Sequence, residues 1–118
     1  MKLSYEGIGQ WAATFACTEV SEGEMVKISG NGTVAACGAG DDFCGMVLSV
    51  GRGGDACAVA LGGMVTAGYT VPAEGAAPAL GWSGLSADGE GGVQADADGS
   101  TYLVVDVDTT AKTVTFVL

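Results

Sequence analysis

Most of the charged residues in this sequence are acidic, with fourteen Asp and Glu against four Lys and Arg. Two close pairs, Asp41 with Asp42 and Asp106 with Asp108, have the residue type that glycosidases use as acid and base. Such a pair also needs a cleft with binding groups, and one Arg and three Lys supply few of them. Chance pairing among fourteen acids accounts for both pairs, so we expect no catalytic carboxylates.

The chain contains no histidine. This excludes Ser-His-Asp and Cys-His nucleophile systems, and every metal site that needs an imidazole ligand. Together with the lack of partners for the carboxylates, the composition predicts that the protein is not an enzyme.

Two short patterns match cofactor or metal motifs in part. The residues from Gly7 to Ala12 fit GxGxxG/A, but only six residues precede them, too few for the buried strand that a dinucleotide site needs. Around Gly99 the spacing partly fits an EF-hand loop, yet Val105 stands where the bidentate Glu is required. We expect no cofactor and no dedicated metal site, while weak cation binding by this acidic turn stays open.

Four cysteines, Cys17, Cys37, Cys44 and Cys57, are separated by 20, 7 and 13 positions, so no CxxC pair is present. Each lies among apolar residues that alternate as in a strand, where a reduced cysteine acts as a small buried hydrophobe. We therefore predict four free thiols, with a disulfide as the main alternative.

Large aromatic and aliphatic residues are the candidates for contact with other molecules. Trp11 and Trp82 adjoin small residues and lie near segments that we expect to be an arm, residues 1–10, and a loop, residues 70–84. Exposed tryptophans commonly anchor interfaces, so we assign Trp11, Trp82 and, in the arm, Tyr5 and Ile8 to an interface. The alternative that both tryptophans complete a sparse core stays open.

The net charge of −10 constrains the partners. A chain this acidic is repelled by phosphate backbones and by anionic lipid, so we expect neither nucleic-acid nor membrane-surface binding. No stretch reaches the 18 or so apolar residues of a membrane helix, and no secretory signal is readable, so synthesis in a cytosol is expected.

Valine, at fourteen residues, is twice as common as leucine, and 21 glycines interrupt every stretch that could form a helix. This predicts an all-β protein: residues 11–118 form one small barrel or sandwich of about eight to ten short strands, preceded by the arm. The expected strands are 11–17, 25–29, 33–37, 43–50, 56–61, 64–69, 85–87, 93–95, 101–107 and 112–118.

Glycine-rich turns suggest how these strands connect. We expect hairpins at residues 29–32, at Gly62-Gly63 and at residues 108–111, and a crossover loop over residues 70–84. Strict alternation in the closing hairpin places Leu103, Val105 and Val107 on one face. Tyr102, Val104, Asp106 and Asp108 then lie on the other.

Six segments follow one another from residue 20 to the end of the chain. They are EGEMVKIS from Glu22, GTV from Gly32, FCGMVLSV from Phe43, GDACAVALGGMV from Gly54, LSADGEGGV from Leu85 and YLVVDVDTTAKTVTFVL from Tyr102. Their order resembles the head decoration, or capsid cement, proteins of tailed bacteriophages and prophages. The resemblance implies a small β-rich structural protein, a homotrimer, bound to the outside of a phage major capsid lattice. It also implies residence in the virion after synthesis in the bacterial cytoplasm.

Two other functions stay open. Glycine-punctuated Val/Ala strands also occur in phage tail-tube and fibre modules, which would be a second structural role. A small-ligand or carbohydrate-binding barrel is the third, with Trp11, Trp82 and Tyr69 as the surface on which a ligand would stack.

Overall fold

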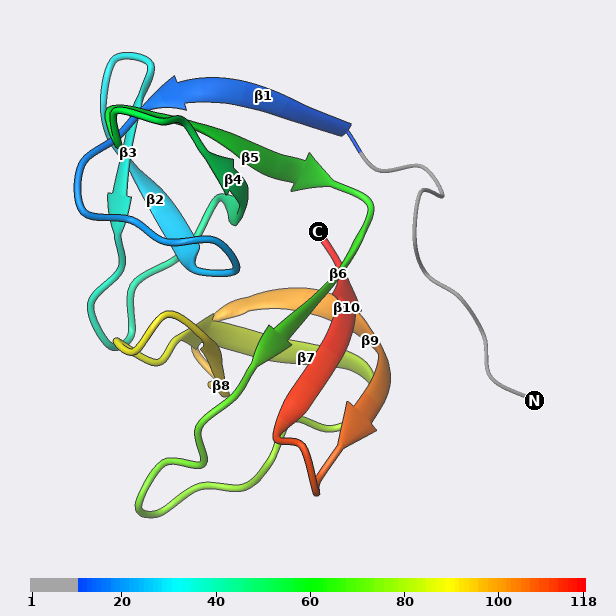
Figure 1. The fold of residues 1–118 in the computed structure, drawn as a ribbon. Helices are drawn as coiled ribbons and strands as arrows, with labels where there is room; N and C mark the ends of the chain where they lie inside the picture. Colours follow the sequence, from blue (N-terminus) through cyan, green and yellow to red (C-terminus); the bar gives the residue numbers. More distant parts are fainter. Residues whose placement is uncertain (1–10) are drawn as a thin grey trace.

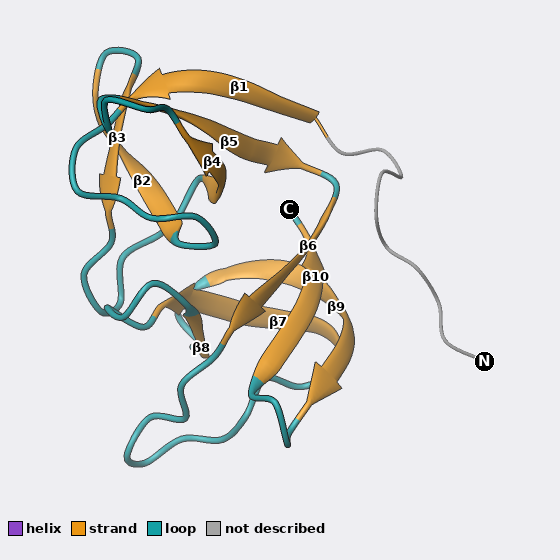
Figure 2. Cartoon of the chain, in the orientation of Figure 1, coloured by secondary structure: helices purple, strands orange, loops and turns teal. Residues whose placement is uncertain are grey.

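The computed structural model describes residues 11–118, and every regular element within that range is a β-strand (Figures 1 and 2). The expected arm, with Tyr5 and Ile8, lies outside the described residues. The ten strands are β1 (Trp11–Ala16), β2 (Met25–Gly30), β3 (Thr33–Ala36), β4 (Gly45–Val50), β5 (Ala56–Gly62), β6 (Met64–Gly68), β7 (Gly81–Ala87), β8 (Val93–Ala95), β9 (Ser100–Asp108) and β10 (Thr113–Val117). The prediction of an all-β domain with a small barrel is confirmed. No described helix is present that could cross a membrane.

The first five strands close into a barrel in the order β1-β3-β2-β4-β5. All pairs are antiparallel except the single parallel contact of Ala16 with Thr33, which joins β1 to β3. Small side chains fill the interior: Cys17, Val20, Val26, Val34, Val47, Cys57 and Val59. Gly45 is required where β4 crosses β5, because a Cβ there would overlap the carbonyl oxygen of Ala60.

The last five strands form a second sheet in the order β6-β10-β9-β7-β8, which lies below the barrel in Figure 1. An isolated parallel bridge between Tyr69 and Val93 brings the end of β6 beside β8, so this sheet curls on itself. Its aromatic core consists of Phe43, Tyr102 and Phe116, with ring centroids 5.1 to 5.8 Å apart. Phe43 comes from the segment before β4, so the barrel and the second sheet share this core.

Most expected strands are confirmed to within a few residues, and so are the hairpins at 29–32 and between β9 and β10. The prediction of a hairpin at Gly62-Gly63 is wrong. Strand β5 pairs with β1 and β4, while β6 pairs with β10, so these glycines carry the chain from the barrel into the second sheet. Gly63 has φ of 92°, a conformation that suits a crossover as well as a hairpin, so the local signal could not separate the two.

Two further corrections concern the second sheet. The expected loop 70–84 ends earlier, because residues 81–85 pair with β9 and place Trp82 in a strand. Strands β9 and β10 contain a β-bulge. Thr115 of β10 pairs with Asp106 of β9, and Phe116 pairs with Val104, so Val105 of β9 has no partner of its own on β10. The bulge reverses the alternation that we expected: Tyr102, Val104 and Val107 pack on the core, whereas Leu103 does not.

Candidate interaction surface

Both candidate tryptophans lie on the surface of the described structure. Trp11 opens β1 and is 60% exposed, and Trp82 lies in β7 and is 74% exposed. Neither side chain therefore completes the core, which closes that alternative. The structure places the two residues on different sheets, one in the barrel and one in the second sheet.

Trp11 is positioned by a glycine. It pairs with Gly62 of β5, and a Cβ built at Gly62 would collide with the indole Nε1 and Cδ1 of Trp11. The indole therefore lies directly against bare backbone, and the register shift between Trp11 and Ala12 forms a local irregularity there. The side chain is held in place while most of its surface stays in solvent.

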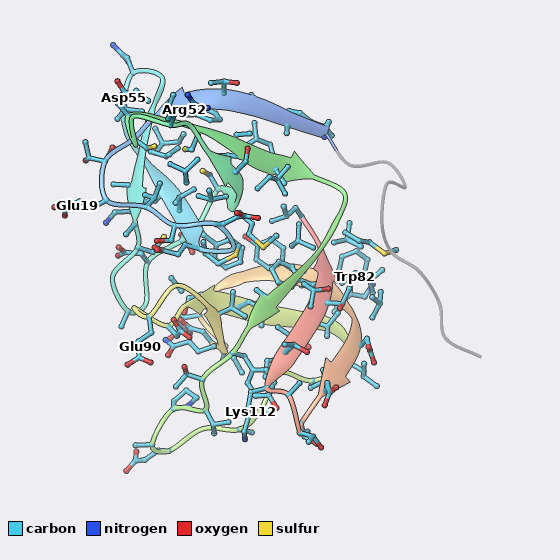
Figure 3. All side chains as sticks on the ribbon, viewed as in Figure 1. Glu19, Arg52, Asp55, Trp82, Glu90 and Lys112 are labelled. Carbon is cyan, nitrogen blue, oxygen red and sulfur yellow. The ribbon has the colours of Figure 1, made fainter. Side chains whose placement is uncertain are left out.

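Trp82 belongs to an apolar row that crosses four strands of the second sheet. Trp82 pairs with Leu103, Leu103 with Val117, and Val117 with Met64. Directly opposed residues point to the same face of a sheet, so the four side chains lie side by side. Their neighbours Val65, Val104 and Phe116 are buried in the core, which identifies the row as lying on the outer face. We call Met64, Val117, Leu103 and Trp82 the outer row; Figure 3 labels Trp82.

Sequence reasoning found Trp82 but missed the other members of the outer row. Leu103 was grouped with two valines because strict alternation ignores the bulge at Val105. Met64 and Val117 could be recognised only once β6, β10 and β9 were known to be neighbours. Leu80, which is 67% exposed, is a further exposed apolar residue just before β7.

One member of each close carboxylate pair accepts hydrogen bonds from its own chain. Asp41 accepts a hydrogen bond of 2.6 Å from Lys27 Nζ and one of 2.8 Å from the Gly38 amide. These bonds lower the pKa of Asp41, and the bond to Asp41 raises the pKa of Lys27. Asp108 accepts hydrogen bonds from the amides of Thr110 and Ala111, which fixes the β9–β10 turn.

Hydrogen bonds within the chain also stabilise the acidic turn around Gly99. A hydrogen bond with Ser86, followed by one from the Asp98 amide, lowers the pKa of Asp96. The described residues contain no group of three or more His, Cys, Asp or Glu side chains that could hold a metal ion.

The cysteines lie in or beside the core. Cys17 and Cys57 are buried in the barrel, and Cys37 and Cys44 are half-buried. Burial, with a hydrogen bond to Cys17, raises the pKa of Cys57 to about 11. Burial and the nearby charge of Asp41 raise the pKa of Cys37 to about 11 as well. Protonated thiols are poor nucleophiles, so neither is suited to covalent chemistry at neutral pH.

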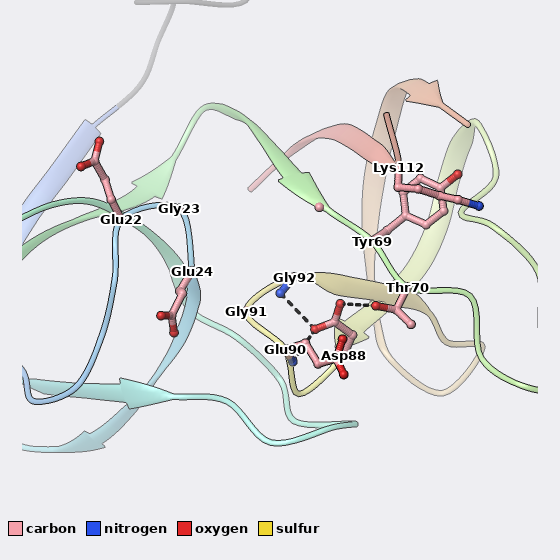
Figure 4. Close-up of a pocket in the computed structure, with 11 residues that line it drawn as sticks. Glu22, Gly23, Glu24, Tyr69, Thr70, Asp88, Glu90, Gly91, Gly92 and Lys112 are labelled. Carbon is pink, nitrogen blue, oxygen red and sulfur yellow. Dashed lines mark hydrogen bonds between the residues drawn. The ribbon is translucent and has the colours of Figure 1, made fainter. Parts of the chain in front are cut away.

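A pocket of about 390 Å³ opens between the turn before β2 and the β7–β8 turn (Figure 4). Its polar lining includes Glu22, Glu24, Asp88, Glu90 and Lys112. The Asp88 carboxylate accepts hydrogen bonds from the Thr70 hydroxyl and from the amides of Glu90 and Gly92, so it stabilises the local fold.

Tyr69 also lines this pocket but is only 6% exposed, with its hydroxyl buried and without a hydrogen-bond partner. It therefore cannot form a stacking surface with the two tryptophans, as the carbohydrate-binding alternative requires. The exposed apolar side chains on the two sheets are suited to contact with another macromolecule.

Comparison of the chain with family models and with curated proteins finds no match.

Proposed function

We propose that this chain is a virion structural protein that binds the outside of a tailed-phage major capsid lattice and reinforces it as a homotrimer. The observation that carries the proposal is the pair of exposed tryptophans, one on each sheet. A decoration protein must contact both its own copies and the shell, and two exposed aromatic anchors on separate sheets meet that need. The resemblance of residues 20–118 to head decoration proteins supports the same role.

The electrostatics also support an outward position. Lys2 and Glu6 fall in residues 1–10, so the described residues carry thirteen acidic and three basic side chains. Mutual repulsion keeps such copies soluble in the bacterial cytoplasm until they dock. An acidic protein also suits the exterior of a shell better than its DNA-facing interior.

The proposal gives residues 1–10, with Tyr5 and Ile8, a part in these contacts. In the assembly the segment adds to the edge of a neighbouring sheet, where main-chain hydrogen bonds supply affinity and alternate side chains supply specificity. Trp11 directly follows the segment, so the contact continues onto the barrel.

The test is co-sedimentation of the purified protein with empty shells of the phage or prophage whose genome encodes it. We expect saturable binding by the full chain, and weaker binding after removal of residues 1–10 with an unchanged β-type circular dichroism spectrum. Unweakened binding by the truncated protein would refute the role of the segment. No binding by the full chain at any concentration would refute decoration.

The oligomeric state is tested separately, by sedimentation equilibrium of the full chain. A trimer is the expected result. Rings or tubes of the protein under the electron microscope would instead favour the tail-tube or fibre role.

A further inference from the structure

The outer face of the second sheet has the layout of a docking surface. Its centre is the outer row, which contains no charge and whose largest member, Trp82, is 74% exposed. The next row on the same face is polar: Thr66 pairs with Thr115, their hydroxyls are 2.8 Å apart, and Thr115 pairs with Asp106. Thr66 and Asp106 are exposed, and Thr115 between them is buried. An apolar centre beside a polar, charged border is the usual anatomy of a protein interface.

This surface is not required by the fold. Met64, Leu103 and Val117 lie outside both clusters of core residues, although each has a buried neighbour in the next position along its strand. Four apolar side chains standing in register across four strands form a continuous patch, and a patch of that kind marks an interaction site more often than scattered single residues do.

The charge distribution indicates which kind of partner binds the outer row. Asp106 is exposed on this face, and among the described residues only Lys27, Arg52 and Lys112 are basic. Lys27 is already paired with Asp41. In a trimer a different face of the next copy would meet this one, and that face would also be acidic, because the described residues carry thirteen acidic and three basic side chains. Nucleic acid or anionic lipid would be repelled in the same way. A protein surface with an apolar centre and a Lys or Arg border is complementary.

We infer that the outer row is the surface that seats this protein on its shell, against an apolar patch of the capsid protein bordered by Lys or Arg side chains. The inference rests on the proposed function and assigns one of its two contacts. Trp82 and Leu103 are the apolar anchors, and Asp106 supplies the charged border.

The experiment measures binding to empty shells of the encoding phage, by co-sedimentation, for three variants of the full chain. The first is Trp82→Ser with Leu103→Ser; the second is Asp106→Asn. The control is Ile28→Ser, which removes a side chain that is 54% exposed on β2 of the barrel. All four substituted residues are exposed or half-buried, and circular dichroism with thermal melts verifies that each variant is folded.

We expect the double variant to bind about a hundredfold more weakly, since interface anchors each contribute about tenfold or more. Asp106→Asn binds a few-fold more weakly at low salt and matches the wild type at 0.5 M NaCl, where the ionic contribution is screened. Ile28→Ser binds as the wild type does.

Other results separate the inference from the proposed function. Wild-type binding that the double variant retains would overturn the seating surface and leave decoration intact. If the double variant loses the trimer in sedimentation equilibrium, the face is a contact between copies, and the inference is again wrong. Absence of wild-type binding to shells would overturn both.

Discussion

The barrel and the second sheet solve the burial problem in different ways. The barrel closes on itself around buried valines and cysteines, with Phe15 and Leu61 packed against them at its margin. The second sheet is built on Phe43, Tyr102 and Phe116 and keeps an outer face on which apolar residues stand in register. The comparison shows that the interior of a closed five-stranded barrel can be formed mainly by small side chains, whereas the second sheet is covered on its inner face by three aromatic rings.

The two tryptophans show the same contrast. Trp11 lies over a glycine at the end of the barrel, held by the absence of a side chain beneath it. Trp82 stands among apolar neighbours from β9, β10 and β6. The first is an isolated anchor and the second is part of a surface.

The largest effect is expected at the core of the second sheet. Phe116 is fully buried against Phe43 and Tyr102, so Phe116→Ala removes one of the three rings of the aromatic cluster and leaves a cavity. We expect the free energy of unfolding to fall by about 3–5 kcal/mol, measured by urea denaturation. Val59→Ala, at an equally buried site in the barrel, serves as the comparison and costs about 2 kcal/mol. Equal losses at the two sites would contradict the view that the second sheet depends on its large side chains.

The barrel cysteines provide the next test. Cys17 and Cys57 are buried and the pKa of Cys57 is about 11, so both should react with iodoacetamide at pH 8 about a hundredfold more slowly in the native protein than in urea. Mass spectrometry counts the adducts. Protein made in a reducing cytosol and alkylated in urea without reductant should carry four; two or none would show that disulfides have formed.

Backbone contact in the barrel is tested by glycine substitution. Gly45→Ala places a Cβ against the carbonyl oxygen of Ala60 and against Val59, and we expect a loss of about 1–3 kcal/mol in urea denaturation. Gly30→Ala is the matched control, because its Cβ would meet only Thr33 at 3.9 Å. Similar stability of the two variants would mean that β4 and β5 can separate at no cost.

The smallest effect concerns the exposed pair of Lys27 and Asp41. The pKa of Asp41 is lowered, so its contribution is present above the ordinary value of 3.8 and is lost as pH falls through the lower native pKa. The pKa of Lys27 is raised, so its contribution is lost as pH rises beyond 10.5 through the native value. Asp41→Asn should therefore lower the melting temperature slightly between these limits, and the difference from the wild type should shrink as pH falls below 3.8.

Asp42→Asn removes the same charge at the next position without removing the Lys27 bond. A melting temperature that responds equally to the two substitutions would show that general acidity, and not the ion pair, controls this region.

Local patterns predicted much of the fold. The strands predicted at residues 25–29, 33–37 and 112–118 match β2, β3 and β10 closely, because these runs are rich in apolar and β-branched residues and adjoin turn residues. Trp82 was recognised as a candidate contact from its small neighbours, although it was expected in a loop. Leu103, Met64 and Val117 were missed because their shared face exists only through three strand pairings, one of which contains a bulge.

The sequence by itself determined the β class, the absence of imidazole chemistry, the acidic surface and the positions of most turns, because each depends on composition or on residues close together in the chain. Only the tertiary structure decided that Gly62-Gly63 leads from the barrel into a second sheet, that Val105 bulges, and that four apolar residues align. Those features depend on which strands become neighbours, and these contacts join residues far apart in the chain, as where Phe43 packs against Tyr102 and Phe116.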